Sequence, residues 1–132
     1  MSKFQIRVYY EDTDAGGIVY YANYLKFSER ARTELLRAVK LEQTDLLKEH
    51  SIAFVVRKAT LECLRPARLD DLLTIETQIT DIGKVSITMQ QHIARGKEVL
   101  ATVAVKLGVI DANMKPTAMP KHVHQAMQKF LK

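Results

Sequence analysis

The amino-acid sequence predicts an α+β fold in which a curved antiparallel β-sheet wraps around one long central helix. Residues 24–39 repeat apolar side chains every three or four positions, whereas the segments before and after them alternate apolar and polar residues. One helix with an apolar stripe and one sheet with an apolar face can bury each other. The chain has 132 residues, which fits a single domain over residues 1–132.

The positive charge of the chain is concentrated at its end. The formal net charge is +5, but residues 112–132 contain four lysines and no acidic residue. A nucleic-acid-binding protein normally spreads basic residues over one surface and interleaves aromatic side chains with them. This sequence lacks that pattern, so we expect no nucleic-acid partner. The basic end is more simply a solvent-exposed helix face that could help to attract an acidic or phosphorylated ligand.

Three absences in the sequence bear on location. The single cysteine, Cys63, excludes an intrachain disulfide. The residues after Met1 alternate in polarity and do not form the apolar core of a signal peptide. No stretch approaches the roughly 18 apolar residues that a membrane helix needs. We therefore expect a cytoplasmic protein without stable membrane insertion.

The first half of the chain predicts a strand, a polar loop and a helix. Alternating apolar residues indicate a strand over residues 3–10, and a loop with two aspartates and two glycines follows over residues 11–17. The helix has an apolar stripe made of Tyr24, Phe27, Ala31, Leu35 and Val39. Asn23 is the expected N-cap, and Thr44 is expected to cap a short helix over residues 45–50.

The second half predicts mostly strands. Residues 52–64 are rich in β-forming residues, and Cys63 falls with Ala59 and Leu61 on an apolar, buried face. Residues 72–110 indicate an antiparallel meander with turns at Gly83-Lys84 and Gly96-Lys97. Apolar residues from Val123 to Phe130 have helical spacing. Exposed edge strands of such a sheet require cover, which a second copy of the chain would supply.

The loop before the long helix holds the densest group of polar residues. Asp12 and Asp14 begin like a calcium loop, but the bidentate glutamate that should close such a loop is absent. No Gly-Lys-Ser/Thr sequence follows Gly16 and Gly17, which excludes a P-loop. Two interpretations stay open here. The aspartates could cap their own turn, or a carboxylate beside the positive end of the helix could act as base or nucleophile on an acyl group.

The other candidate groups predict no rival chemistry. Cys63 is expected to be a buried, inert thiol. The four histidines have no zinc spacing, so we expect no metal site. No Gly-x-Ser-x-Gly segment surrounds any serine. The Asp14 loop therefore remains the best candidate for an active site, and the chemistry that suits it is hydrolysis of an activated ester or thioester.

The segment from Tyr9 to Tyr24, with the sequence YYEDTDAGGIVYYANY and followed by Phe27, Glu29, Arg30 and Arg32, resembles the signature of the 4-hydroxybenzoyl-CoA thioesterase family. Within that family the chain is most similar to the YbgC-type acyl-CoA thioesterases associated with the bacterial Tol–Pal envelope system. Residues 54–57, 66–72, 114–116 and 120–121 match further stretches of the family. The resemblance covers nearly the whole chain.

This resemblance implies a hotdog fold, with the sheet wrapped around the helix, and a homodimer or homotetramer with active sites at subunit interfaces. It implies that Asp14 is the catalytic carboxylate and that the Tyr21 backbone N–H binds the thioester oxygen. Substrate-binding residues are implied at Gly17, Ile18, Val19, Val56 and, for a CoA phosphate, Lys84. Many relatives carry histidine where this chain has Tyr21. That change leaves the backbone donor in place but removes an imidazole.

The resemblance implies an enzyme that hydrolyses acyl-CoA to a free acid and CoA, with no cofactor beyond the CoA of its substrate. The alternative is a non-enzymatic hotdog module that binds acyl carrier protein or an envelope-system partner. Acyl carrier protein is generally acidic and the C-terminal segment is basic, so attraction between them is expected. The sequence leaves open the acyl chain length and whether CoA or acyl carrier protein carries the acyl group.

Overall fold

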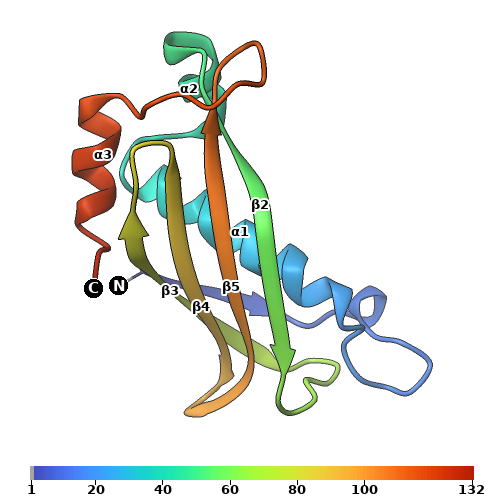
Figure 1. The fold of residues 1–132 in the computed structure, drawn as a ribbon. Coiled ribbons are helices and arrows are strands. Elements are labelled where there is room, and N and C mark those ends of the chain that lie inside the picture. The colour runs from blue at the N-terminus through green and yellow to red at the C-terminus, as the bar shows by residue number, and fades with distance from the viewer. Residues whose placement is uncertain (1) are drawn as a thin grey trace.

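The computed structural model describes residues 2–132 as a five-stranded antiparallel sheet that curves around one long helix (Figure 1). The helices are α1 (Ala22–Ala38), α2 (Gln43–His50) and α3 (Lys121–Gln128). The strands are β1 (Ser2–Arg7), β2 (Ala53–Cys63), β3 (Leu72–Ile82), β4 (Ser86–Arg95) and β5 (Glu98–Ile110). Their order across the sheet is β1-β3-β4-β5-β2. The predicted α+β architecture is confirmed.

The apolar stripe of α1 is the centre of the core. Tyr24, Phe27, Ala31 and Leu35 are buried as predicted, and the buried face extends to Ser28, Arg32 and Leu36. Full burial of a side chain such as Phe27 or Leu35 contributes about 1.5–3 kcal/mol. The N-terminal half of α1 packs with β1, the first part of β3 and the second part of β4. Its C-terminal half packs with α2, α3, the second part of β3 and the first part of β4. The helix therefore has a fixed position over the sheet.

Both predicted helix caps are wrong. The helix α1 begins at Ala22, so Asn23 lies inside its first turn, and the Asn23 side chain donates 2.8 Å to the Asp12 carbonyl instead of capping. The helix α2 begins at Gln43 after Glu42, so Thr44 is also a helical residue. In both cases the chain enters the helix one or more residues earlier than the local pattern indicates.

The sheet shows the predicted period of two. Alternate residues of β3 and β4 are buried, among them Ile75, Ile79, Ile87 and Ile93. A register shift between Ile93 and Ala94 breaks the alternation in the paired β5, where Leu100 and Ala101 are both buried. The first strand ends at Arg7, earlier than residue 10, because the chain turns into a short 3-10 helix (Tyr10–Asp12).

The edge strand β2 departs most from expectation. It pairs with β5 and forms one border of the sheet. Ala59 and Cys63 are exposed and Leu61 is only partly buried, so the predicted buried position of Cys63 is wrong. The reason is tertiary, because β2 is an edge strand of which Phe54 and Leu61 pack against the core, whereas Cys63 at its end does not. Val56, also on β2, is 52% exposed.

The third helix closes the other side of the core. Val123 and Met127 of α3 are buried, as the helical spacing predicts. After α3 the chain runs beside β3, where Ile79 N–H donates to the Phe130 carbonyl and Lys132 N–H donates to the Ile79 carbonyl. Because the start of β1 also pairs with β3, at Thr77, it lies close to the C-terminal end of the chain (Figure 1).

Candidate active site

The loop between β1 and α1 is a closed turn held by its own backbone. Asp14 N–H donates 2.9 Å to the Ile18 carbonyl, and Gly17 N–H donates 3.0 Å to the Asp14 carbonyl. Gly17 has a φ of 81°, a left-handed conformation that favours glycine. The Asp14 carboxylate accepts a 2.8 Å hydrogen bond from Gly16 N–H. The sequence interpretation of an Asx turn is therefore correct, and the same turn presents Asp14 at the surface.

The turn leads directly into the start of α1. Tyr21 is the N-cap residue, already in helical conformation, and the helix has no side-chain cap hydrogen bond. The first N–H groups of a helix lack intrahelical partners and carry the positive end of the helix dipole. In α1 the Asn23 and Tyr24 N–H groups donate to the Tyr20 and Tyr21 carbonyls, which leaves the N–H groups of Tyr21 and Ala22 as the donors at this end. Such donors favour negative charge, and the Asp14 turn lies immediately before them along the chain.

A surface cavity of about 380 Å³ joins these two features. Four of the predicted site residues line it: Asp14, Ile18, Val19 and Tyr21. Its other wall consists of Tyr24 from α1, the last residue of β2, Cys63, and residues 64–66 that follow it. Sequence reasoning missed this second wall, although Pro66 correctly indicated the strand end. A carboxylate, helix N-terminal donors and apolar walls in one cavity are suited to binding an acyl group.

Three groups in this region have shifted pKa values. Burial raises the pKa of the Tyr24 hydroxyl, which accepts a 3.2 Å hydrogen bond from Ala67 N–H. Partial burial raises the pKa of the Cys63 thiol, which disfavours the nucleophilic thiolate at neutral pH. The Tyr21 hydroxyl, with a smaller effect from the Asp14 charge, raises the pKa of Tyr20. Of the nucleophile candidates in this cavity, Asp14 is therefore better suited than Cys63.

The structure does not bring every predicted site residue to this cavity. Gly17 shapes the turn but is not among the residues that line the cavity. Lys84 lies in the β3–β4 hairpin beside another hollow of about 290 Å³, with Met119 and His124. Val56 lines a cavity of about 250 Å³ between α1 and the sheet. Within one chain, Asp14, Lys84 and Val56 therefore line three separate cavities.

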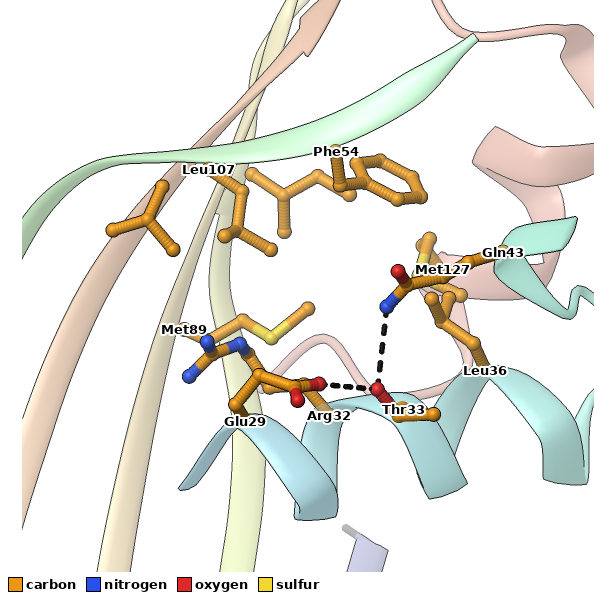
Figure 2. A pocket seen from close by; sticks show the side chains of 11 residues that line it. Glu29, Arg32, Thr33, Leu36, Gln43, Phe54, Met89, Leu107 and Met127 are labelled. Atoms are coloured by element: carbon orange, nitrogen blue, oxygen red, sulfur yellow. Dashed lines mark hydrogen bonds between the residues drawn. The ribbon is translucent and has the colours of Figure 1, made fainter. Parts of the chain in front are cut away.

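The cavity at Val56 has apolar side chains on the side of the sheet and several polar side chains on the side of α1 (Figure 2). Phe54 and Leu107 face α1 from the sheet, and Met127 and Leu36 close one end. On the helix side, Gln43 donates 3.3 Å to the Thr33 hydroxyl, which in turn donates to the Glu29 carboxylate. This pattern suits a mainly apolar group with one polar end.

Arg32 also lines this cavity and is a buried residue. Burial lowers its pKa, and the nearby Glu29 charge opposes that shift. Because the pKa of arginine starts near 12.5, the side chain keeps its charge at neutral pH. The α1 side of the cavity consequently carries the positive charge of Arg32 and the Glu29 carboxylate beside it. Within residues 2–132, no three histidine, cysteine or acidic side chains cluster as metal ligands.

Comparison with known proteins decides the family. The family model of the thioesterase-like superfamily matches residues 8–127, which include the Asp14 loop and the strands β2 to β5 but not β1. The chain belongs to the thioesterase-like superfamily. The match confirms the resemblance read from the Asp14 motif and the hotdog fold that it implied.

Relatives of this superfamily member are similar over most of their length. The acyl-CoA thioesterase YbgC of Haemophilus influenzae is 46% identical over 124 residues, which cover 93% of this chain and 91% of the relative. The acyl-CoA thioester hydrolase YbgC of Escherichia coli O6:H1 is 49% identical over 123 residues, which cover 92% and 91%. The crystal structure of a probable thioesterase from Bartonella henselae has a TM-score of 0.86 at 40% identity, and the match covers 89% of this chain and 98% of that chain. Across residues 2–132 of this superfamily member, no helix is long and apolar enough to cross a membrane.

Proposed function

We propose that this superfamily member is an acyl-CoA thioesterase, which hydrolyses acyl-CoA thioesters to a free acid and CoA. The observation that carries the proposal is that Asp14 and Tyr21, the N-cap residue of α1, line one cavity. The names of the Haemophilus influenzae and Escherichia coli relatives support the same reaction class.

In the proposed reaction, Asp14 takes one of two roles. As a general base it removes a proton from water, whose oxygen attacks the thioester carbonyl carbon. As a nucleophile its own oxygen attacks, and water then hydrolyses the mixed anhydride. In both routes the C–S bond breaks and CoA leaves as a thiolate that takes up a proton. We propose no cofactor other than the CoA of the substrate.

The Tyr21 backbone N–H is the proposed donor to the negative charge that develops on the thioester oxygen. This N–H belongs to the N-cap residue of α1, where the helix dipole favours negative charge. The Tyr21 side chain is 59% exposed, and a backbone donor does not depend on its identity. The tyrosine in place of histidine should therefore alter rate or substrate preference more than the type of reaction.

A second copy of the chain is the proposed source of the missing substrate contacts. The border strand β2 has no neighbour on its outer side within residues 2–132. Pairing between two copies along this edge would satisfy its backbone groups and cover the exposed Val56. We propose that Val56 and Lys84 of neighbouring copies complete the pocket that Asp14, Gly17, Ile18 and Val19 begin. The assembly would be a homodimer or homotetramer.

The family resemblance leads us to propose a cytoplasmic protein that acts with the Tol–Pal envelope system. Acyl carrier protein is a second candidate acyl carrier, or the bound partner if the module is not an enzyme. Lys121, Lys129 and Lys132 are exposed at the C-terminal end and could attract an acidic protein. A partner-binding module predicts tight binding without turnover.

The deciding experiment is a thiol-release assay with acyl-CoA thioesters of increasing chain length and with an aromatic acyl-CoA. We expect turnover by the unchanged chain and a fall in kcat of about 10²- to 10⁴-fold in Asp14→Asn. The matched control is Asp81→Asn, because Asp81 is an exposed acid on β3 outside the cavity. Near-normal turnover by Asp14→Asn would refute the role of Asp14. No turnover of any acyl-CoA, with tight binding of acyl carrier protein, would favour the binding module.

A further inference from the structure

The Asp12 carbonyl connects the two ends of the loop between β1 and α1. It accepts one hydrogen bond of 2.9 Å from the Tyr20 backbone N–H and a second of 2.8 Å from the Asn23 side-chain nitrogen, Nδ2. Asp12 lies two residues before Asp14, and Tyr20 lies one residue before Tyr21. One carbonyl thus receives bonds from the returning end of the loop and from the first turn of α1.

Asn23 is the side chain that connects this loop to the helix. It lies within the first turn of α1 and is partly buried, and its own backbone N–H donates 2.8 Å to the Tyr20 carbonyl. A carboxamide offers both a donor and an acceptor, whereas a carboxylate of the same shape offers only acceptors. The contact to Asp12 needs a donor, so asparagine fits this position and aspartate does not.

Several other hydrogen bonds of the loop are made within it, whereas one pair of bonds links its later part to α1 through Ala67: Val19 N–H donates to the Ala67 carbonyl, and Ala67 N–H donates to the Tyr24 hydroxyl. Thr13 donates to the Tyr10 carbonyl, Tyr9 N–H donates to the Asp12 carboxylate, and Gly16 N–H donates to Asp14. These bonds preserve the shape of the turn. The bond from the Asn23 side chain differs from these because it joins the Asp12 end of the loop, two residues before Asp14, directly to α1.

We infer that Asn23 is a positioning residue, which sets the position of Asp14 relative to the Tyr21 N–H at the start of α1. This inference rests on the proposed function, in which those two groups act on the same thioester. A displacement of about 1 Å between reacting groups can lower a rate about 10²-fold. Asn23 acts through Asp12 and Tyr20, and it need not touch the substrate.

The test uses Asn23→Asp, which keeps the shape of the side chain and replaces its donor with a carboxylate oxygen that repels the Asp12 carbonyl. The negative charge lies in the first turn of α1, where it favours the helix. We expect kcat for acyl-CoA hydrolysis to fall about 10- to 100-fold with little change in KM, because the geometry of reaction changes more than binding. The midpoint of urea unfolding should stay close to that of the unchanged chain.

Amide hydrogen exchange gives a second readout that does not depend on activity. In Asn23→Asp the Tyr20 N–H, which shares the Asp12 carbonyl, should exchange faster, while core amides such as that of Ile79 keep their protection. The control is Asn113→Asp, since Asn113 is the only other asparagine and is exposed in a distant turn. It should leave kcat, KM and Tyr20 exchange unchanged.

The outcomes separate this inference from the proposed function. If Asp14→Asn is inactive while Asn23→Asp keeps the kcat of the unchanged chain, the role of Asn23 is overturned and that of Asp14 stands. If Asp14→Asn remains active, the proposed function itself fails. Should Asn23→Asp unfold, Asn23→Ala removes the donor without adding charge. A loss of kcat that only follows the loss of folded protein in both variants also overturns the inference.

Discussion

The Arg32 guanidinium donates to the Gln91 amide oxygen across 3.0 Å in the interior, between α1 and the central part of the sheet. Arg32 is 9% exposed and Gln91 is fully buried. The Gln91 amide nitrogen in turn donates to the Ser28 carbonyl and to the Thr77 hydroxyl, each at 3.0 Å. A buried charge on the helix is therefore held by one neutral side chain of β4, which also anchors the helix backbone.

Replacing Gln91 by leucine should destabilise the protein more than replacing Arg32 by methionine. The first change leaves a buried cation without its acceptor and should cost about 3 kcal/mol, whereas the second removes the charge itself and should cost about 1 kcal/mol. Urea unfolding of both variants and of the double variant measures this. A double variant that is more stable than Gln91→Leu is expected, and equal stability of the two single variants would contradict the explanation.

Gly17→Ala should weaken both stability and activity. An alanine at a φ of 81° costs about 1 kcal/mol, and relief of that strain would move the Asp14 turn. Gly96 is the matched control, because its φ is 60° and it lies in the β4–β5 turn away from the cavity. Both variants should lose similar stability in urea unfolding, but only Gly17→Ala should also lose thioesterase kcat. Equal activity in the two variants would argue against a role for the turn geometry.

Cys63 should be dispensable for hydrolysis even though it lines the Asp14 cavity. Its raised pKa keeps the thiol protonated at neutral pH, so it is a poor nucleophile. We expect Cys63→Ala to retain turnover in the thiol-release assay. Reaction of the unchanged chain with N-ethylmaleimide should be slow at pH 7, faster at pH 9, and should lower activity by filling the cavity. Loss of turnover in Cys63→Ala would assign catalysis to the thiol.

Asp71 should contribute stability that depends on pH. Partial burial alone would raise its pKa, but hydrogen bonds from Arg68 N–H and from the Arg95 guanidinium, with their charges, outweigh burial and lower the pKa. A folded-state pKa below the unfolded value of about 3.9 gives stability above that pH, which is lost as the pH falls through the folded-state pKa.

The variant Asp71→Asn should therefore unfold at a lower temperature than the unchanged chain at pH 7, and the difference should shrink as the pH falls below about 4. Thermal unfolding followed by circular dichroism at several pH values measures this. Asp45→Asn is the control, since Asp45 is an exposed acid of α2. A difference that stays constant from pH 7 to pH 3 would show that the charge of Asp71 is not its cause.

The helix and strand pattern was predictable because it depends on residues close together in the chain. The stripe from Tyr24 to Leu35 and the alternation along β3 and β4 follow from periods of about four and two. The candidate loop was also predictable, since two aspartates and two glycines before a long helix are a local pattern. The helix starts were not, because Asn23 binds Asp12, a contact made only once the loop has folded back.

The sequence by itself determined the fold class, the family and the position of Asp14 before the central helix, since each depends on local periodicity or on a contiguous motif. Only the tertiary structure decided what surrounds Asp14. It exposes Cys63 because the core reaches Phe54 and Leu61 of the edge strand but not its end, and it joins residues 63–66 to the Asp14 cavity. It also places Val56 and Lys84 elsewhere, since contacts between distant residues depend on the packing of the sheet against the helix.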